Sequence, residues 1–141
     1  MSLYLDTSLL VAALTPEVRS ERVEAWLQSQ AHSDLVVSDW VIAEFSAALS
    51  IKRRRDDIDE AQRAKALAGF SLLCAESFTT LPVSRDHFHN AARFADQYSL
   101  GLRAADALHL AVCVGHGATL CTLDRRLSNA GPELGVATLL V

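Results

Sequence analysis

The first ten residues, MSLYLDTSLL (1–10), place a carboxylate between two apolar runs. Leu3–Leu5 has the length and character of a short buried strand, and residues 9–11 resume the apolar pattern in what reads as the first helix. Asp6 lies at the junction, where its side chain can cap the helix. In open α/β sheets, ligands also bind outside the carboxyl ends of the strands, so acids at comparable places elsewhere in the chain bear on the role of Asp6.

Short apolar runs alternate with amphipathic stretches along the rest of the chain. Further strands are predicted at residues 35–37, 78–83, 119–122 and 136–140. Further helices are predicted at residues 20–30, 39–55, 56–76, 85–98, 103–114 and 125–130; Gly101 ends the fourth, and Gly115 and Gly117 end the fifth. The alternation predicts an α/β fold with a mostly parallel central sheet that helices cover on both faces.

Length and composition predict one globular domain over residues 1–141. Half of the residues are hydrophobic and 21% are charged, which suits a chain with a real core. No apolar run approaches the roughly 20 residues that a membrane span needs. The N-terminus lacks a basic segment, and Asp6 interrupts its apolar stretch, so it makes a poor signal peptide. We therefore expect a cytoplasmic protein with no membrane partner.

The net charge of the chain and the spacing of its cysteines and histidines argue against several classes of protein and of metal site. A net charge of −4 argues against a general nucleic-acid coat protein, but not against an enzyme that meets phosphates through a metal. Three cysteines without a C-x-x-C pair predict reduced, mostly buried thiols. The five histidines fit no common zinc motif. Only His87 and His89 lie close together, and we interpret them as part of a solvated helix face.

Glu44 occupies a position where helical periodicity predicts an apolar side chain. In SDWVIAEFSAAL (38–49) it shares a row with Val41, Phe45 and Ala48. A carboxylate on that core-facing row is costly unless something compensates its charge.

Two more acids lie at comparable places. In GLRAADALHLAV (101–112), Asp106 falls in the first helical turn and shares a row with Leu102 and Leu110. Asp124 follows the strand ending at Thr122 by two residues, so it should approach the same sheet edge as Asp6. Four acids thus avoid the surface positions that acids normally occupy.

The chemistry of four converging carboxylates points to a hard cation. Their mutual repulsion would raise their pKa values unless a cation were present, and oxygen ligands suit Mg²⁺ or Mn²⁺. Such an ion polarises phosphate esters and activates water for their hydrolysis. Taken singly, each acid also has a structural interpretation. Asp6 and Asp124 can cap helices, Glu44 can pair with an arginine, and Asp106 can favour the helix dipole.

Four segments together resemble a known family: YLDTSLLVAAL (4–14), SDWVIAEFSAAL (38–49), LRAADALHLAV (102–112) and LCTLDRRL (120–127). In this order they are similar to PIN-domain ribonucleases, and most similar to VapC-type toxins of bacterial type II toxin–antitoxin pairs. The resemblance spans essentially the whole chain and makes it a single PIN domain. It implies a three-layer α/β/α sandwich and Mg²⁺-dependent endoribonuclease activity, with Mn²⁺ as a possible substitute.

The resemblance also assigns roles to residues. Asp6, Glu44, Asp106 and Asp124 fall on the acidic positions of the family. Asp6 and Asp106 are expected as direct metal ligands, whereas Glu44 and Asp124 are expected in an outer shell or at a second ion. Ser8 and Thr122 match hydroxyl positions that support the acids. Arg126 stands where many members carry a further acid or asparagine, so a second ion site would lack that group.

Partners follow from the same resemblance. An RNA substrate, a cognate antitoxin and a homodimer are expected, with residues 40–55 and the neighbouring helix as contact surfaces. Arg103, close to Asp106, is a candidate for holding the scissile phosphate or for neutralising the acids. The basic run at residues 52–55 has three interpretations: RNA contact, partner contact or a solvated helix end.

Other functions remain as alternatives. A haloacid-dehalogenase-type phosphatase needs a second aspartate where this chain has Ser8, and it needs a late lysine. The only lysines are Lys52 and Lys65. A phosphoreceiver domain needs the same late lysine. The strongest alternative is a catalytically inactive PIN-like module that binds RNA or protein, and the presence of all four acids argues against it.

Overall fold

The computed structural model describes all 141 residues and places five parallel strands in one sheet. The strands are β1 (Leu3–Leu5), β2 (Leu35–Ser38), β3 (Thr79–Leu81), β4 (Thr119–Thr122) and β5 (Thr138–Leu140). The α-helices are α1 (Thr7–Leu14), α2 (Ser20–Gln28), α3 (Asp39–Arg54), α4 (Glu60–Glu76), α5 (Arg85–Ala95), α6 (Ala104–His116) and α7 (Arg125–Glu133). Two 3₁₀ helices, η1 (His32–Asp34) and η2 (Tyr98–Leu100), complete the fold.

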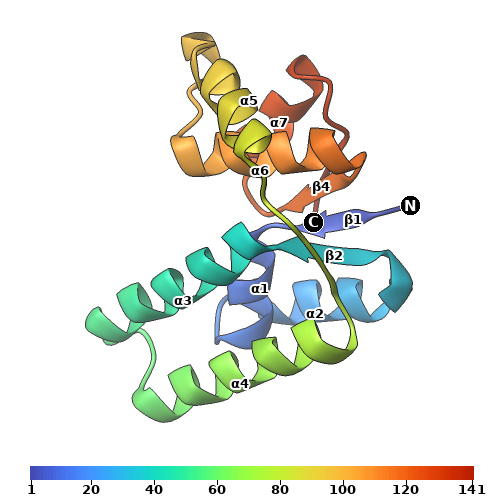
Figure 1. Cartoon of the computed structure of the whole chain (residues 1–141). Coiled ribbons are helices and arrows are strands. Elements are labelled where there is room, and N and C mark those ends of the chain that lie inside the picture. The colour runs from blue at the N-terminus through green and yellow to red at the C-terminus, as the bar shows by residue number, and fades with distance from the viewer.

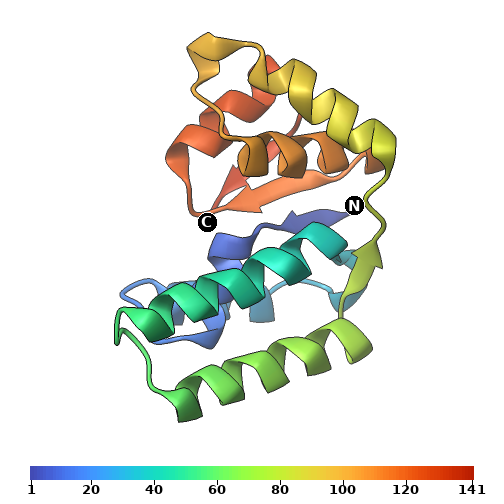
Figure 2. The same cartoon turned by 60° about the vertical axis from the view of Figure 1, so that its left-hand side comes forward.

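The helices form a layer on each face of the sheet, as predicted. Helices α1 to α4 lie on one side, and α5, α6 and α7 lie on the other (Figures 1 and 2). The chain begins in the middle of the sheet, adds β2 and β3 on one side, and then returns to add β4 and β5 on the other. Crossovers between parallel strands are nearly always right-handed, so this reversal moves the later helices to the opposite face. The result is a three-layer α/β/α sandwich.

The strand order β3-β2-β1-β4-β5 reverses between β1 and β4. Leu5 pairs with Cys121, and the amide of Asp6 donates to the carbonyl of Cys121 at 3.1 Å. The carboxyl ends of β1 and β4 therefore lie side by side. This is the place in a parallel sheet where the flanking loops diverge and leave room for a ligand.

The core holds the apolar side chains of the central strands and the inner helix faces. Tyr4, Leu5 and Leu9 are fully buried, and the ring of Phe45 lies 4.3 Å from that of Phe70. Phe45 therefore belongs to the core and not to a base-stacking surface. All three cysteines are free thiols, as expected. None of the helices combines the length and apolarity that crossing a membrane would need.

The helix predicted from residue 56 begins later. Asp59 is the N-cap of α4: its Oδ1 accepts from the amide of Gln62 at 2.7 Å, and the Gln62 side chain accepts from the Asp59 amide at 2.9 Å. This reciprocal pair fixes the helix start. Asp56 instead has a φ of 59°, the left-handed conformation that follows a helix end. Asp56 and Asp57 thus lie in the turn between α3 and α4.

Two boundaries around α5 and α6 also differ from the prediction. Helix α5 ends at Ala95, and residues 98–100 form a separate 3₁₀ turn closed by Gly101 at a φ of 64°. Gly115 lies inside α6, which ends at Gly117. A Cβ on Gly115 would overlap the ring of His87, so this glycine permits a close approach of α5 to α6. His87 is therefore buried and caps α5, and only His89 fits the predicted solvated face.

Candidate active site

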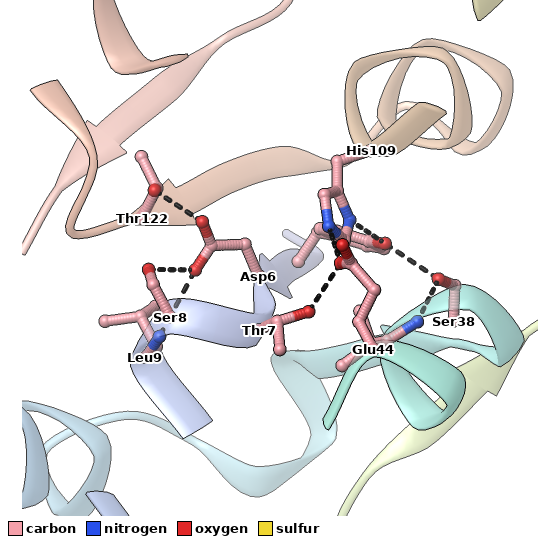
Figure 3. A network of polar contacts seen from close by, with 10 residues as sticks. Asp6, Thr7, Ser8, Leu9, Ser38, Glu44, His109 and Thr122 are labelled. Carbon is pink, nitrogen blue, oxygen red and sulfur yellow. Dashed lines mark hydrogen bonds and ion pairs between the residues drawn. The ribbon is translucent and has the colours of Figure 1, made fainter. Parts of the chain in front are cut away.

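Asp6 lies at the end of β1 and caps α1 (Figure 3). Its Oδ1 accepts from Ser8 Oγ at 2.6 Å and from the amide of Leu9 at 3.2 Å, and its Oδ2 accepts from Thr122 Oγ1. Only 4% of Asp6 is exposed. Burial raises the pKa of this carboxyl group, and the two hydroxyl donors partly offset that rise. The structure thus places both predicted supporting hydroxyls, Ser8 and Thr122, on Asp6.

The same hydroxyls tie Asp6 to the loop after β4. Ser8 Oγ accepts from the amide of Leu123 at 3.2 Å, and Thr122 Oγ1 accepts from the amide of Asp124 at 2.9 Å. Each hydroxyl therefore donates to the carboxylate and accepts from the backbone of the neighbouring strand end. This double use fixes the position of Asp6 relative to Asp124, because neither hydroxyl is free to rotate.

Glu44 reaches the site from α3, and its partner is a histidine. Its Oε1 accepts from Thr7 Oγ1 at 2.7 Å and contacts His109 Nε2 (Figure 3). Burial would raise the pKa of Glu44, but the hydrogen bond and charge of His109 and the hydrogen bond from Thr7 outweigh it and lower the pKa. Pairing with an arginine, one interpretation of this acid, is therefore wrong.

His109 belongs to a buried chain of polar groups behind Glu44. Its Nδ1 lies 2.8 Å from the hydroxyl of Tyr4, which lies 2.7 Å from Ser38 Oγ. Because Ser38 Oγ already accepts from the amide of Val41, its proton is available for Tyr4. The Nε2 proton of His109 is directed at Glu44, and Nδ1 can accept from Tyr4 in the neutral ring or donate to it in the charged ring. Every group in the chain is satisfied when the ring is neutral.

Sequence reasoning did not identify His109 or Tyr4 as site residues. His109 is only 3% exposed, unlike the solvated histidines expected from the spacing of His87 and His89. One signal was present: His109 follows Asp106 by three positions on an apolar helix, which places both side chains on neighbouring parts of one face. Tyr4 gave no comparable signal, because an aromatic residue in a buried strand is ordinary.

Asp106 and Asp124 approach the site from α6 and from the end of β4. Burial raises the pKa of the half-buried Asp106, and the nearby negative charge of Asp124 raises it further. Asp124 Oδ1 accepts from the amides of Arg126 and Leu127 at 2.8 and 3.1 Å, so this side chain caps α7. Asp124 is exposed, and the expectation that all four acids avoid the surface is wrong for this residue.

The charges at the site are suited to a cation. Asp6, Asp106 and Asp124 take part in no salt bridge, and Arg103, the exposed N-cap residue of α6, pairs with none of them. The available donors are carboxylate and hydroxyl oxygens, which suit Mg²⁺ or Mn²⁺. No three His, Cys, Asp or Glu side chains converge at metal-binding geometry. What fits a hard cation is the chemistry of these oxygen donors, since Mg²⁺ is commonly bound by one or two carboxylates together with water.

The basic run at residues 52–55 is partly engaged within the chain. Lys52 Nζ lies 2.8 Å from Glu17, and Arg53 contacts Asp56 at 2.9 Å. Arg54 and Arg55 form no ion pair.

An open cleft of about 710 Å³ adjoins the acids. Its lining includes Thr7, Ser8 and Asp124, together with Arg19. The guanidinium of Arg19 donates to the carbonyl of Leu123 at 3.1 Å. The cleft thus leads from the ends of β1 and β4 to residues 17–19, which precede α2.

Solved structures share this fold at low sequence identity. VapC20 of Mycobacterium tuberculosis, described as a sarcin–ricin loop cleaving toxin, is 20% identical with a TM-score of 0.74 over 92% of this chain and 95% of its own. FitAcB of Neisseria gonorrhoeae is 21% identical with a TM-score of 0.70 over 97% and 96%. VapBC2 of Rickettsia felis, bound to a promoter DNA fragment, is 16% identical with a TM-score of 0.69 over 100% and 99%.

The sequence itself identifies the family. No functionally curated protein matches the chain. The family model of the PIN domain, however, matches residues 3–131, which include all four acids. The chain belongs to the PIN domain family.

Proposed function

We propose that this PIN domain, spanning residues 1–141, is a Mg²⁺-dependent endoribonuclease and the toxin of a VapC-type toxin–antitoxin pair. The observation that carries the proposal is the placement of Asp6. It is buried, hydrogen-bonded by Ser8 and Thr122, and lies at the reversal of strand order without a cationic partner. Burying an ionised carboxylate in that place lowers the stability of the fold, and a role in binding a metal ion explains why the chain has one there.

Asp6 and Asp106 are the proposed metal ligands. The ion, when bound, supplies charge to the scissile phosphate and lowers the pKa of water. Mn²⁺ can substitute for Mg²⁺, because both prefer oxygen ligands. Ser8 and Thr122 hold the Asp6 carboxylate in one orientation. Asp124, anchored as the cap of α7, is proposed in the outer shell or at a second ion.

Glu44 is proposed to orient the attacking water. Its Oε1 receives the hydrogen bonds of Thr7 and His109, while Oε2 accepts none within the chain. Oε2 is therefore the atom available to accept a proton from water. The lowered pKa of Glu44 keeps the carboxylate ionised and able to accept at neutral pH. The Ser38–Tyr4–His109 chain holds Glu44 from behind.

A cognate antitoxin and a second copy of the chain are the proposed protein partners, in the cytoplasm. The support for the antitoxin comes from similar structures, because one from Klebsiella pneumoniae is described as a toxin–antitoxin complex and VapBC-5 of Mycobacterium tuberculosis as a member of the VapBC family of toxin–antitoxin systems. Residues 40–55 of α3 offer exposed side chains, including Ile42 and Ile51, for such a contact. RNA is the proposed substrate, with Arg103 one candidate contact.

Cleavage of single-stranded RNA by the Asp6→Asn variant tests the proposal. Asparagine keeps the size and the helix cap of Asp6 but removes the charge, so the protein should fold and lose at least about 100-fold in rate. Asp57→Asn, at an exposed turn residue, is the matched control and should cleave at the wild-type rate. A folded Asp6→Asn protein with an undiminished rate refutes the assignment. Absence of cleavage by the wild type with Mg²⁺ favours the inactive binding module.

A further inference from the structure

Three adjoining hollows lead away from the acids and share arginine side chains. The cleft beside Asp124 includes Arg19 in its wall. A second hollow of about 240 Å³ shares Arg19 and Leu123 with that cleft and adds Arg22 and Arg125. A third, of about 410 Å³, shares Arg125 with the second and adds Arg126. We call this surface, defined by Arg19, Arg22, Arg125 and Arg126, the arginine groove.

The four arginines of the arginine groove take part in no salt bridge with an Asp or Glu side chain. All four are exposed. Arg53 and Arg63 elsewhere, in contrast, pair with Glu60. Two of them are oriented by backbone oxygens. Arg19 donates to the carbonyl of Leu123 at 3.1 Å, and Arg22 donates to an oxygen of Val141, the last residue of the sequence, at 2.5 Å. The bond to the peptide carbonyl of Leu123 fixes the position of the Arg19 guanidinium without cancelling its charge.

We infer that the arginine groove binds the phosphates of the RNA strand next to the bond that is cut, an inference that rests on the proposed function. Guanidinium groups bind phosphate oxygens in bidentate pairs, and four of them line a path that begins at Asp124. The local positive charge contrasts with the net charge of −4 of the chain. An acidic protein segment is the competing occupant. The direct continuity with the carboxylate cleft favours the substrate, because a strand leaving the site must cross this surface.

The substrate contacts in the arginine groove are different from Arg103, the candidate contact at the start of α6. Arg19 borders the cleft itself and would meet the phosphate nearest the acids. Arg22 and Arg125 face the second hollow and would meet the next phosphate, and Arg126 would meet one beyond it. The exposed pair Arg54 and Arg55, in contrast, lies at the far end of α3 and lines none of these hollows.

Salt-dependent RNA binding by the double variant Arg22→Ala/Arg125→Ala tests the inference. The probe is a fluorescein-labelled 12-nucleotide single-stranded RNA of mixed sequence, with Asp6→Asn as the uncut background. Affinity should fall about tenfold or more, and the slope of log K against log salt should fall by about 1.4, since each single-strand phosphate contact contributes about 0.7. Arg85→Ala/Arg93→Ala, which replaces two exposed arginines of α5 outside these hollows, is the matched control and should change neither quantity.

Further measurements distinguish the loss of charge from a change in structure, and an RNA substrate from a protein partner as the occupant of the groove. The variant Arg22→Lys/Arg125→Lys keeps both charges and should retain the wild-type salt slope. In otherwise wild-type protein, the alanine pair should raise KM for RNA cleavage and leave kcat within about twofold.

An unchanged salt slope with the alanine pair, or no RNA binding at all, overturns the inference. Equal affinity of the groove for poly-glutamate would indicate a protein partner and also overturn it. Absence of cleavage despite groove-dependent binding counts against the proposed function alone.

Discussion

At the scale of single residues, the site depends on hydroxyl groups as much as on carboxylates. Ser8 and Thr122 each donate to Asp6 and accept from the backbone after β4. Both are expected from the family resemblance, in which they match hydroxyl positions that support the acids. The role of Thr7 as a donor to Glu44 could not be predicted, since it depends on how α3 packs beside α1. His109 and Tyr4 were missed for the same reason: their partners come from three separate segments.

The Tyr4 hydroxyl gives a direct test of the buried polar chain. Tyr4→Phe keeps the ring but leaves Ser38 Oγ and His109 Nδ1 without their partner. The free energy of unfolding should fall by about 1–3 kcal/mol, the usual cost of an unsatisfied buried polar group. Denaturant unfolding measures the change. Tyr98→Phe, at a residue that is 91% exposed, is the control and should have no measurable effect. Equal stability of the two variants would contradict the role of the chain.

At the scale of elements, most helices and strands could be predicted from periodicity, and the errors fall where tertiary contacts override it. Asp56 and Asp57 look like a helix start, but the reciprocal cap of Asp59 and Gln62 begins α4 later. Gly115 looks like a helix end, yet α6 continues through it because His87 from α5 occupies the space of its missing side chain. A close approach between two helices cannot be recognised from the local sequence, because it depends on a residue elsewhere in the chain.

Gly115 and Gly69 form a matched pair for testing that approach. Both lie inside helices, where alanine is intrinsically favoured by about 0.5–1 kcal/mol. A Cβ at Gly69 would meet Leu14 at 3.5 Å, an ordinary contact, so Gly69→Ala should stabilise the protein by about that amount. Gly115→Ala should instead destabilise it by about 1–3 kcal/mol, because the ring of His87 is held by its cap with Ser84. Thermal unfolding distinguishes the two, and stabilisation by both variants would show that α5 and α6 adjust freely.

At the scale of the whole molecule, the alternation of elements predicts a parallel sheet but not the order of its strands. The order determines that β1 and β4 are neighbours, and this brings Asp6 beside Thr122 and Asp124. The expectation that the four acids converge comes from their separate unusual positions and from the family resemblance, and the structure brings no three of them to metal-binding geometry. The exposure of Asp124 was not foreseen, because Asp6 and Asp124 both cap the helix after a strand, yet only Asp6 is buried by the surrounding elements.

The raised pKa values of Asp6 and Asp106 make the metal-free fold sensitive to pH. The folded protein holds these protons more tightly than the unfolded chain, so both groups favour folding below the ordinary Asp pKa of about 3.9 and progressively disfavour it as pH rises through the raised values. Asp106→Asn removes one of these contributions. Its stability relative to wild type should therefore increase as pH rises, in a chelator, when followed by denaturant unfolding.

Two comparisons control for this pH effect. Glu44, whose pKa is lowered, acts in the opposite sense, but its contribution is present in both proteins and cancels in the difference. Mg²⁺ should raise the stability of the wild type above the raised pKa values more than that of Asp106→Asn, because it binds the folded state through this carboxylate. If the difference in stability between the wild type and Asp106→Asn stayed constant across pH, it would contradict a raised pKa at Asp106.

The most direct test of the carboxylate site is the initial rate of single-stranded RNA cleavage as a function of Mg²⁺ concentration. The wild type should show no cleavage in a chelator and a saturable rise in rate as Mg²⁺ is added, and Asp106→Asn should need more Mg²⁺ or remain inactive. Cleavage at the same rate in the chelator, or a Mg²⁺ dependence that Asp106→Asn leaves unchanged, would contradict a metal-dependent active site at the ends of β1 and β4.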